Sequence, residues 1–159
     1  NGSERGRWLA GGGLTFNGDT SSDNALDDYE EGVFTPTVFG TGAAGTGTYT
    51  QQKGRYTKVG DKVTIWYYVA WTNLTSASGG LGIGGLPFTA NTTDNWQQTG
   101  SVMTHQVALD DDCAGVVTHQ YPTAGTGMLF YQSRTGSQNW DDVDIDSSGA
   151  AIGQATYPA

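Results

Sequence analysis

The sequence has few basic residues, a single cysteine and no long apolar segment. Lysine and arginine total 7 against 16 aspartate and glutamate residues, so the chain of 159 residues has a formal net charge of −9. Nucleic acids and anionic membranes are bound through clustered basic residues, and this balance argues against both as partners. No apolar run approaches the roughly 20 residues of a membrane-spanning helix, so no membrane insertion is expected. Cys113 stands alone, which excludes an intrachain disulfide.

Motifs of the common enzyme and cofactor sites are also missing. The chain contains no Gly-x-Ser-x-Gly, no His-Glu-x-x-His and no phosphate-binding loop that ends in Lys-Ser or Lys-Thr. The glycine-rich run Gly79–Gly85 does not precede a predicted helix, so it does not fit a dinucleotide-binding turn. We therefore expect a protein that is not an enzyme and that has no cofactor.

The residues that are abundant favour β-structure. There are 25 glycines, aromatic residues make up 11% of the chain, and only 14% of the residues are charged. Roughly eight or nine short strand patterns recur without a helix of any length, which predicts an all-β fold, an antiparallel β-sandwich of jelly-roll type. We expect residues 1–32 to be a connector made of a short hairpin and an acidic turn, and residues 33–159 to form the sandwich. The opening residues predict an interior fragment of a longer protein.

The strongest strand pattern is a hairpin centred on Gly60–Asp61. Glycine at the first central position of a two-residue turn is typical of a type II′ hairpin, which sets Tyr56 opposite Ile65. In the second strand, Val63–Trp71, alternate residues on one face are apolar, but the other face carries Trp66 and is not polar either. Both faces are therefore expected to pack, against a second layer or another subunit.

Other strands are marked by shorter patterns. Val33–Phe39 is interrupted by Pro36, which is expected at a sheet edge or a bulge because proline cannot donate a ladder hydrogen bond. Leu26–Gly32 is predicted as a single acidic, helix-like turn, and Ser133–Ser148 as a polar loop. The remaining strands are predicted at Leu81–Leu86, Ser101–Leu109, Ala114–Tyr121, Met128–Gln132 and Ala151–Tyr157.

Three distinctive segments follow one another in the chain: NALDDYEEGVFTPTV (Asn24–Val38), GTYTQQKGRYTKVGDKVTIW (Gly47–Trp66) and GGLGIGGLPFTA (Gly79–Ala90). In this order they resemble the C-terminal domain of bacteriophage tail fibre and tailspike proteins. The upstream SERGRWLAGGGLTFNGDT (Ser3–Thr20) is similar to the short lead that often precedes that domain. The resemblance covers about residues 3–90; from Asn91 onward it is only general.

The resemblance implies a homotrimer of β-sandwiches at the distal end of a tail fibre or tailspike of the virion. It also implies an upstream fibre shaft and attachment to a polysaccharide or glycan of the host surface. Two alternatives remain open at this stage. The domain is a trimerisation or folding module without a ligand of its own, or it is a depolymerase of capsule polysaccharide.

Two loops have the composition expected of a glycan site. Ring faces stack on the apolar faces of sugars while polar neighbours bond to hydroxyl groups. The candidates are Trp96 beside Asn95, and Trp140 beside Asn139 and Asp141; Tyr121 and Arg134 are candidates to assist. Each tryptophan could instead be a core or subunit-interface residue, since tryptophan is usually well buried.

Histidine and acidic residues offer weaker patterns. If the chain turns about Asp112, His105 and His119 lie opposite each other on one face, as a transition-metal pair or as two polar residues on a wet face. The acidic groups at 27–31, 110–112 and 141–146 could hold a cation or be exposed corners. Two carboxylates held about 5–10 Å apart could also hydrolyse a glycosidic bond. We assign no metal and no catalytic residue to these groups.

Overall fold

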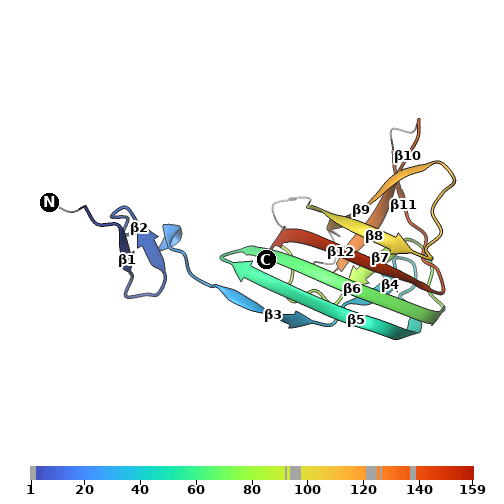
Figure 1. The fold of residues 1–159 in the computed structure, drawn as a ribbon, viewed down its shortest axis with the longest axis horizontal. Helices are drawn as coiled ribbons and strands as arrows, with labels where there is room; N and C mark the ends of the chain where they lie inside the picture. Colours follow the sequence, from blue (N-terminus) through green and yellow to red (C-terminus); the bar gives the residue numbers. More distant parts are fainter. Residues whose placement is uncertain (1–2, 92, 94–97, 121–124, 126, 137–138) are drawn as a thin grey trace.

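The chain folds into two all-β parts joined by a short link (Figure 1). The computed structural model describes residues 3–91, 93, 98–120, 125, 127–136 and 139–159. A two-stranded hairpin comes first, followed by a ten-stranded antiparallel sheet. The predicted all-β class is confirmed. No helix in the described part of the chain is long and apolar enough to cross a membrane.

The strands of the large sheet run in the order β3-β5-β6-β12-β8-β9-β10-β7-β4, and β11 pairs with β10 off this path. The hairpin consists of β1 (Gly6–Trp8) and β2 (Leu14–Phe16), and a 3-10 turn, η1, spans Ser22–Asn24. The strands of the sheet are β3 (Glu30–Phe34), β4 (Thr37–Gly40), β5 (Thr46–Val59), β6 (Lys62–Thr75), β7 (Leu81–Gly84), β8 (Thr99–His105), β9 (Cys113–Gln120), β10 (Gly127–Arg134), β11 (Trp140–Asp142) and β12 (Gly149–Pro158).

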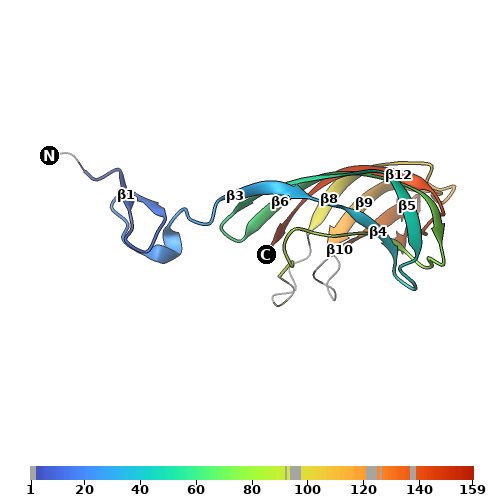
Figure 2. The same ribbon diagram turned by 90° about the horizontal axis from the view of Figure 1, so that it is seen from below.

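The sheet is strongly curved, so its two halves face each other across one core (Figure 2). Consecutive strands β3 and β4 lie at opposite ends of the strand order, and the break between them falls at Thr35 and Pro36. The two ends of the sheet are then tied together by side chains. The hydroxyl group of Tyr49 accepts a hydrogen bond from the backbone N–H of Val38 (3.0 Å), and the Gln52 amide donates to the carbonyl of Pro36 (3.0 Å). The expected two-layer core is therefore built from one continuous sheet.

The central hairpin has the predicted turn and register. Gly60 has a φ of 59°, Asp61 is not left-handed, and Tyr56 pairs with Ile65. Alternate residues from Val63 to Trp71 are buried in the core, as expected. On the opposite face, called here the outer face, Trp66 keeps 45% of its surface exposed. Within one chain, the hairpin thus packs on one side only.

Two local predictions are wrong. The helix-like turn at Leu26–Gly32 is absent, because Glu30–Phe34 pairs with Gly54–Lys58 of β5 and is drawn into the sheet as an edge strand. The predicted polar loop after Ser133 contains β11, which pairs with Tyr131–Ser133. In both places, main-chain pairing with a neighbouring strand overrides a polar sequence that has little strand preference of its own.

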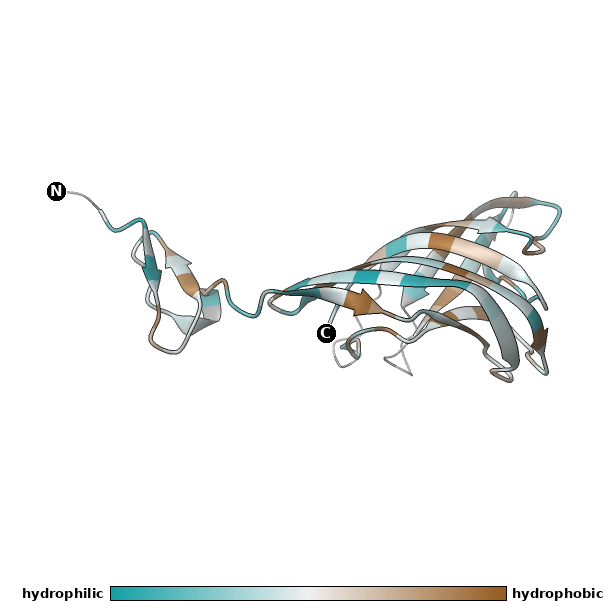
Figure 3. Ribbon diagram, turned by 60° about the horizontal axis from the view of Figure 1, so that its bottom comes forward, coloured by the Kyte–Doolittle hydropathy of each residue, from teal (hydrophilic) through white to brown (hydrophobic). Residues whose placement is uncertain are grey.

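The N-terminal hairpin lies beyond the end of the large sheet, and the link between the two is hydrophilic (Figure 3). Thr15 is buried at 1% exposure, whereas Trp8 is 79% exposed. The link is fixed to the sheet by an ion pair between Asp28 and Lys58 of β5. An isolated two-stranded hairpin is marginally stable in water, so this part depends on its surroundings.

The glycines of β7 allow an aromatic ring to lie directly on the sheet. The ring of Phe39 in β4 covers Gly82, where an added Cβ would lie 2.7 Å from Cε1 of the ring. The same ring covers Gly127 of β10, where an added Cβ would lie 2.8 Å from Cε1. Glycines at these positions leave room for the ring to approach the backbone closely.

Replacing Gly82 with alanine should destabilise the protein. The new methyl group would overlap Phe39, and overpacking of this kind costs about 1–3 kcal/mol. Urea unfolding followed by tryptophan fluorescence would measure the loss. Gly11→Ala is the matched control, because no atom lies within 4 Å of an added Cβ there. Equal stability of the two variants would contradict the packing described.

Candidate functional site

Three aromatic side chains meet on the outer face where β9, β10 and β11 lie side by side. The register pairs Val117 with Tyr131 and Ser133 with Trp140, which puts these side chains on one face. His119 follows Val117 on the same face of β9. These strands run steeply across the direction of β5 and β6 (Figure 1). The cluster therefore lies on the half of the curved sheet that contains β9, β10 and β11, away from β5 and β6.

His119, Tyr131 and Trp140 form what we call the ring cluster. The ring centroids are 5.6 Å apart for His119 and Tyr131, 6.4 Å for Tyr131 and Trp140, and 6.3 Å for His119 and Trp140. The rings of Tyr131 and His119 meet edge to face, at an interplanar angle of 76°. Edge-to-face contacts at these distances are favourable. The contacts hold the rings against one another before any ligand arrives.

A groove of about 270 Å³ opens beside the ring cluster. Trp140 is 71% exposed, whereas His119 is only 7% exposed. Burial lowers the pKa of His119, so its imidazole is neutral at neutral pH. The groove is lined by Thr99, Gly115, Val117, His119, Tyr131, Gln132, Ser133 and Trp140. It combines an exposed ring with hydroxyl groups, which is the chemistry that binds the faces and hydroxyls of a sugar.

Arg134 and Asp141 form a separate group, on the other side of the β10–β11 ladder from the ring cluster. Successive residues of a strand point to opposite faces, so Asp141 is directed away from the face of Trp140. Arg134 forms ion pairs with Asp110, with Asp141 (2.9 Å) and with Asp112 (3.8 Å). Burial of the guanidinium opposes its charge, but the three carboxylates outweigh this and raise the pKa of Arg134.

The buried side-chain amide of Gln132 forms hydrogen bonds to this acidic group. Its nitrogen donates to the carboxylate of Asp110 (2.8 Å) and to the carbonyl of Asp142 (3.2 Å). Its oxygen accepts from the backbone N–H of Asp110 (3.0 Å). The β8–β9 connection is therefore fixed onto β10 and β11, and the group of carboxylates around Arg134 is a structural cross-link.

The other predicted site residues are less informative. Asn139 is exposed beside Trp140, while Trp96, Asn95 and Tyr121 lie outside the described residues. Tyr131 and His119 were not predicted as partners of Trp140. Tyr131 belongs to the apolar run Met128–Gln132, where only the strand register reveals which side chains reach the outer face.

The predicted pairing of His105 with His119 is wrong. His119 lies opposite Thr99 of β8, and His105 lies opposite Ala150 of β12. After Ser101, β8 continues beside β12 alone, so the connection to β9 is longer than a turn about Asp112 would be. Among the residues that the structure describes, no group of three or more histidine, cysteine or acidic side chains is placed to hold a metal ion.

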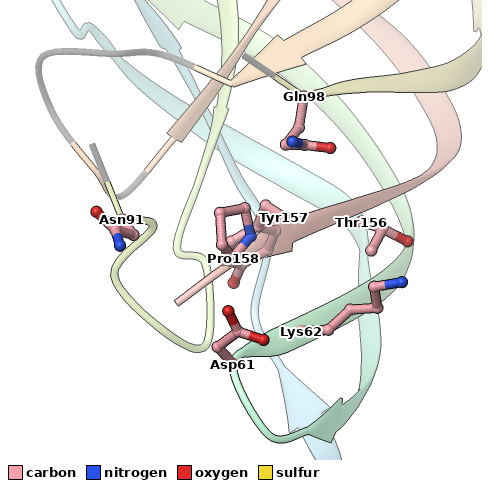
Figure 4. A pocket seen from close by; sticks show the side chains of 7 residues that line it. All are labelled: Asp61, Lys62, Asn91, Gln98, Thr156, Tyr157 and Pro158. Carbon is pink, nitrogen blue, oxygen red and sulfur yellow. The ribbon is translucent and has the colours of Figure 1, made fainter. Parts of the chain in front are cut away.

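A second cavity, of about 340 Å³, lies at the Gly60–Asp61 end of the central hairpin (Figure 4). Asp61, Lys62, Asn91, Gln98 and Thr156 surround it with polar groups, together with Pro158. Its one described aromatic residue, Tyr157, is 1% exposed and bonds to the backbone of Phe88. Without an exposed ring among these residues, the cavity offers less to a sugar than the groove at Trp140 does.

Comparison with known proteins points to the tailspike fold. No protein-family model matches the sequence, and no curated protein matches it either. The fold is similar to that in a solved structure described as the crystal structure of Dettilon tailspike protein (gp208), with a TM-score of 0.53 and 18% sequence identity. The match covers 82% of this chain and 24% of that chain, so this chain spans about a quarter of the tailspike's length. The resemblance noted in the sequence is thus matched by a likeness of fold.

Replacing Arg134 with methionine should destabilise the sheet at neutral pH. Three carboxylates would then face one another without a cation, and their repulsion is screened by salt. We expect a lower urea midpoint at pH 7, with a smaller difference from the unmodified protein in 1 M salt. Arg5→Met, at an exposed arginine without an ion pair in the described structure, is the control. A loss that is independent of salt would show that Arg134 acts by packing alone.

Proposed function

We propose that this chain is a receptor-binding domain of a phage tail fibre or tailspike, which attaches the virion to a glycan of the host surface. The ring cluster and its groove bind the sugar, with Trp140 as the exposed stacking surface. The observation that supports this most directly is the combination of a 71% exposed tryptophan, two supporting rings and a groove of about 270 Å³. Aromatic platforms of this kind are common in sites for neutral, hydroxyl-rich ligands.

The likeness to a tailspike supports the biological setting. A fold found in a tailspike, in a chain that spans a quarter of that protein, is consistent with a terminal domain carried on an upstream fibre shaft. In this proposal the domain lies at the distal part of the fibre or spike. The hairpin and hydrophilic link of residues 3–29 precede the sheet (Figure 1), and in this proposal they connect it to the shaft.

Binding rather than hydrolysis is the activity that we propose. A glycosidase needs two carboxylates that flank the sugar. The carboxylates of Asp110, Asp112 and Asp141 are paired with Arg134 and lie on the other side of the β10–β11 ladder from the ring cluster. Of the two aspartates of β11, only Asp142 shares the face of the ring cluster. This arrangement disfavours the depolymerase alternative at this site.

Self-association is a second proposed role, and a different part of the outer face supports it. Four exposed apolar side chains lie there across β3, β6, β12 and β8; we call them the outer patch. The register sets Ile152 directly opposite Met103, and Arg55 between Val33 and Trp66. Exposed apolar areas that span several strands are typical of interaction sites. We propose that two further copies of the chain cover this patch in a homotrimer. Its members are Val33, Trp66, Met103 and Ile152.

Replacing Trp140 with alanine should abolish most glycan binding. Loss of a central aromatic contact is expected to weaken affinity by at least about tenfold. A glycan array of neutral and acidic oligosaccharides, followed by calorimetry on the best ligand, would measure the change. Trp8→Ala is the control, since Trp8 is exposed to a similar extent but lies on the N-terminal hairpin.

A second variant tests the groove without removing a ring. An added Cβ at Gly115 meets only Ser133 Oγ, at 3.8 Å, so Gly115→Leu can fill the groove while the strand stays in place. We expect it to block binding as Trp140→Ala does. A domain that binds no glycan, or that binds equally well in both variants, would contradict the proposal.

Introducing a charge into the outer patch should dissociate the trimer. Met103→Glu and Ile152→Glu place unpaired carboxylates in an interface that is apolar in this proposal, and burying such charges is strongly unfavourable. Sedimentation equilibrium should give a trimer for the unmodified chain and a shift toward monomer for each variant. Leu109→Glu introduces the same charge outside the patch. A monomeric unmodified chain would argue against self-association.

A further inference from the structure

We infer that the groove beside the ring cluster takes uncharged sugars and rejects anionic ones such as uronic or sialic acids. This inference rests on the proposed function and adds the chemical class of the ligand. It follows from where the charges of the chain lie relative to the groove. Recognition of a sugar carboxylate in proteins depends on an available cation or an array of donors.

Positive charge is nearly absent from the part of the chain that builds the groove. Residues 99–159 contain seven aspartates and one arginine, with no lysine and no glutamate, which is a formal charge of −6. Every residue that lines the groove falls within this range. The groove therefore lies in the most acidic region of the protein.

The one cation of this region is already engaged. Arg134 forms ion pairs with three carboxylates, and it lies on the other side of the β10–β11 ladder from Trp140. A ligand carboxylate would have to displace one of these partners and reach around the strands. Arg134 therefore cannot neutralise an anionic sugar that is stacked on the ring cluster.

The cations elsewhere on the outer face are too distant to help. Lys53 and Arg55 belong to β5, and Lys62 lies on the outer face of β6 with Trp66; at least β12 and β8 separate these strands from β9. Three or four strand spacings amount to about 14–19 Å along the sheet. This exceeds the Debye length of about 8 Å at physiological ionic strength, so their attraction is largely screened at the groove.

The groups that do line the groove suit an uncharged ligand. Thr99 and Ser133 present hydroxyl groups, which can both donate to and accept from sugar hydroxyls. Tyr131, Trp140 and Val117 supply apolar surface for the carbon face of a ring. His119 is buried and neutral, because burial disfavours its charged form. An uncharged hexose ring can thus be satisfied without any ion pair.

The test uses matched ligands with the full chain. Neutral oligosaccharides from the array are compared with the same oligosaccharides in which the C6 hydroxymethyl group is oxidised to a carboxylate. We expect at least about fivefold weaker binding of the oxidised form at low salt, and a smaller difference in 0.5 M salt, where repulsion is screened. Preferential binding of the oxidised form would overturn the inference.

A charge introduced at the rim of the groove tests the cause. Ser133 is exposed and lies opposite Trp140, so Ser133→Lys adds a cation beside the ring cluster. We expect Ser133→Lys to narrow or reverse the preference for the neutral over the oxidised oligosaccharide. Ser133→Gln, with a long neutral side chain, should keep that preference. Thr99→Lys provides an independent position should Ser133→Lys fold poorly.

The outcomes separate this inference from the proposed function. If binding depends on Trp140 but favours acidic glycans, the inference alone is overturned. The same holds if Ser133→Lys and Thr99→Lys both leave the selectivity between neutral and acidic glycans unchanged. Absence of any Trp140-dependent glycan binding overturns the proposed function and the inference with it.

Discussion

The junction between β8 and β9 is the constraint on which the rest of the sheet depends. Only three residue pairs join these strands, Thr99–Ser101 with Val117–His119. On the inner face of the junction, Gly100 lies so close to Ala155 and Thr118 that an added Cβ would be 2.6 Å from each. This absence of a side chain lets the sheet turn from the β12 half to the β10 half. The same short register brings Thr99, Val117 and His119 together, so the bend that closes the core also lines the groove.

The two faces of the β10–β11 ladder have different tasks because alternate residues of a strand point in opposite directions. Trp140 and Asp141 are neighbours in sequence, yet one joins an aromatic cluster and the other joins an ion-pair group. The ion pairs and the Gln132 amide hold the ladder from one side, while the rings remain available on the other. The rigidity of the groove is thus supplied by polar contacts that no ligand in the groove has to disturb.

Sequence patterns predicted those parts of the fold that depend on local information. The period-two alternation of Val63–Trp71 and the turn glycine at position 60 are local, and both gave the correct hairpin and register. The register of β8 is not local, because pairing with Ala150–Ala155 of β12 draws the strand away from β9. That pairing separates His105 from His119. The prediction that these two residues lie opposite each other assumed a tight turn about Asp112. Likewise, β11 forms because its main chain bonds to β10. Its own sequence, one tryptophan and two aspartates, does not predict a strand. Trp140 could be chosen as a candidate from its polar neighbours, but Tyr131 and His119 join it only through that non-local register.

The position of β3 has a mechanical consequence. This strand is both the edge of the sheet and the continuation of the hydrophilic link, and it pairs with β5 over five residues from Glu30 to Phe34. The link approaches along the long axis of the molecule, in line with β3 and β5 (Figure 1). Tension that enters through the link therefore pulls β3 along its own length and loads its hydrogen bonds to β5 in shear, all at once. The ion pair of Asp28 with Lys58 lies at the point where the tension enters. A strand that is pulled sideways from one end would lose its hydrogen bonds one at a time, so we expect the attachment of β3 to resist pulling better than such an arrangement.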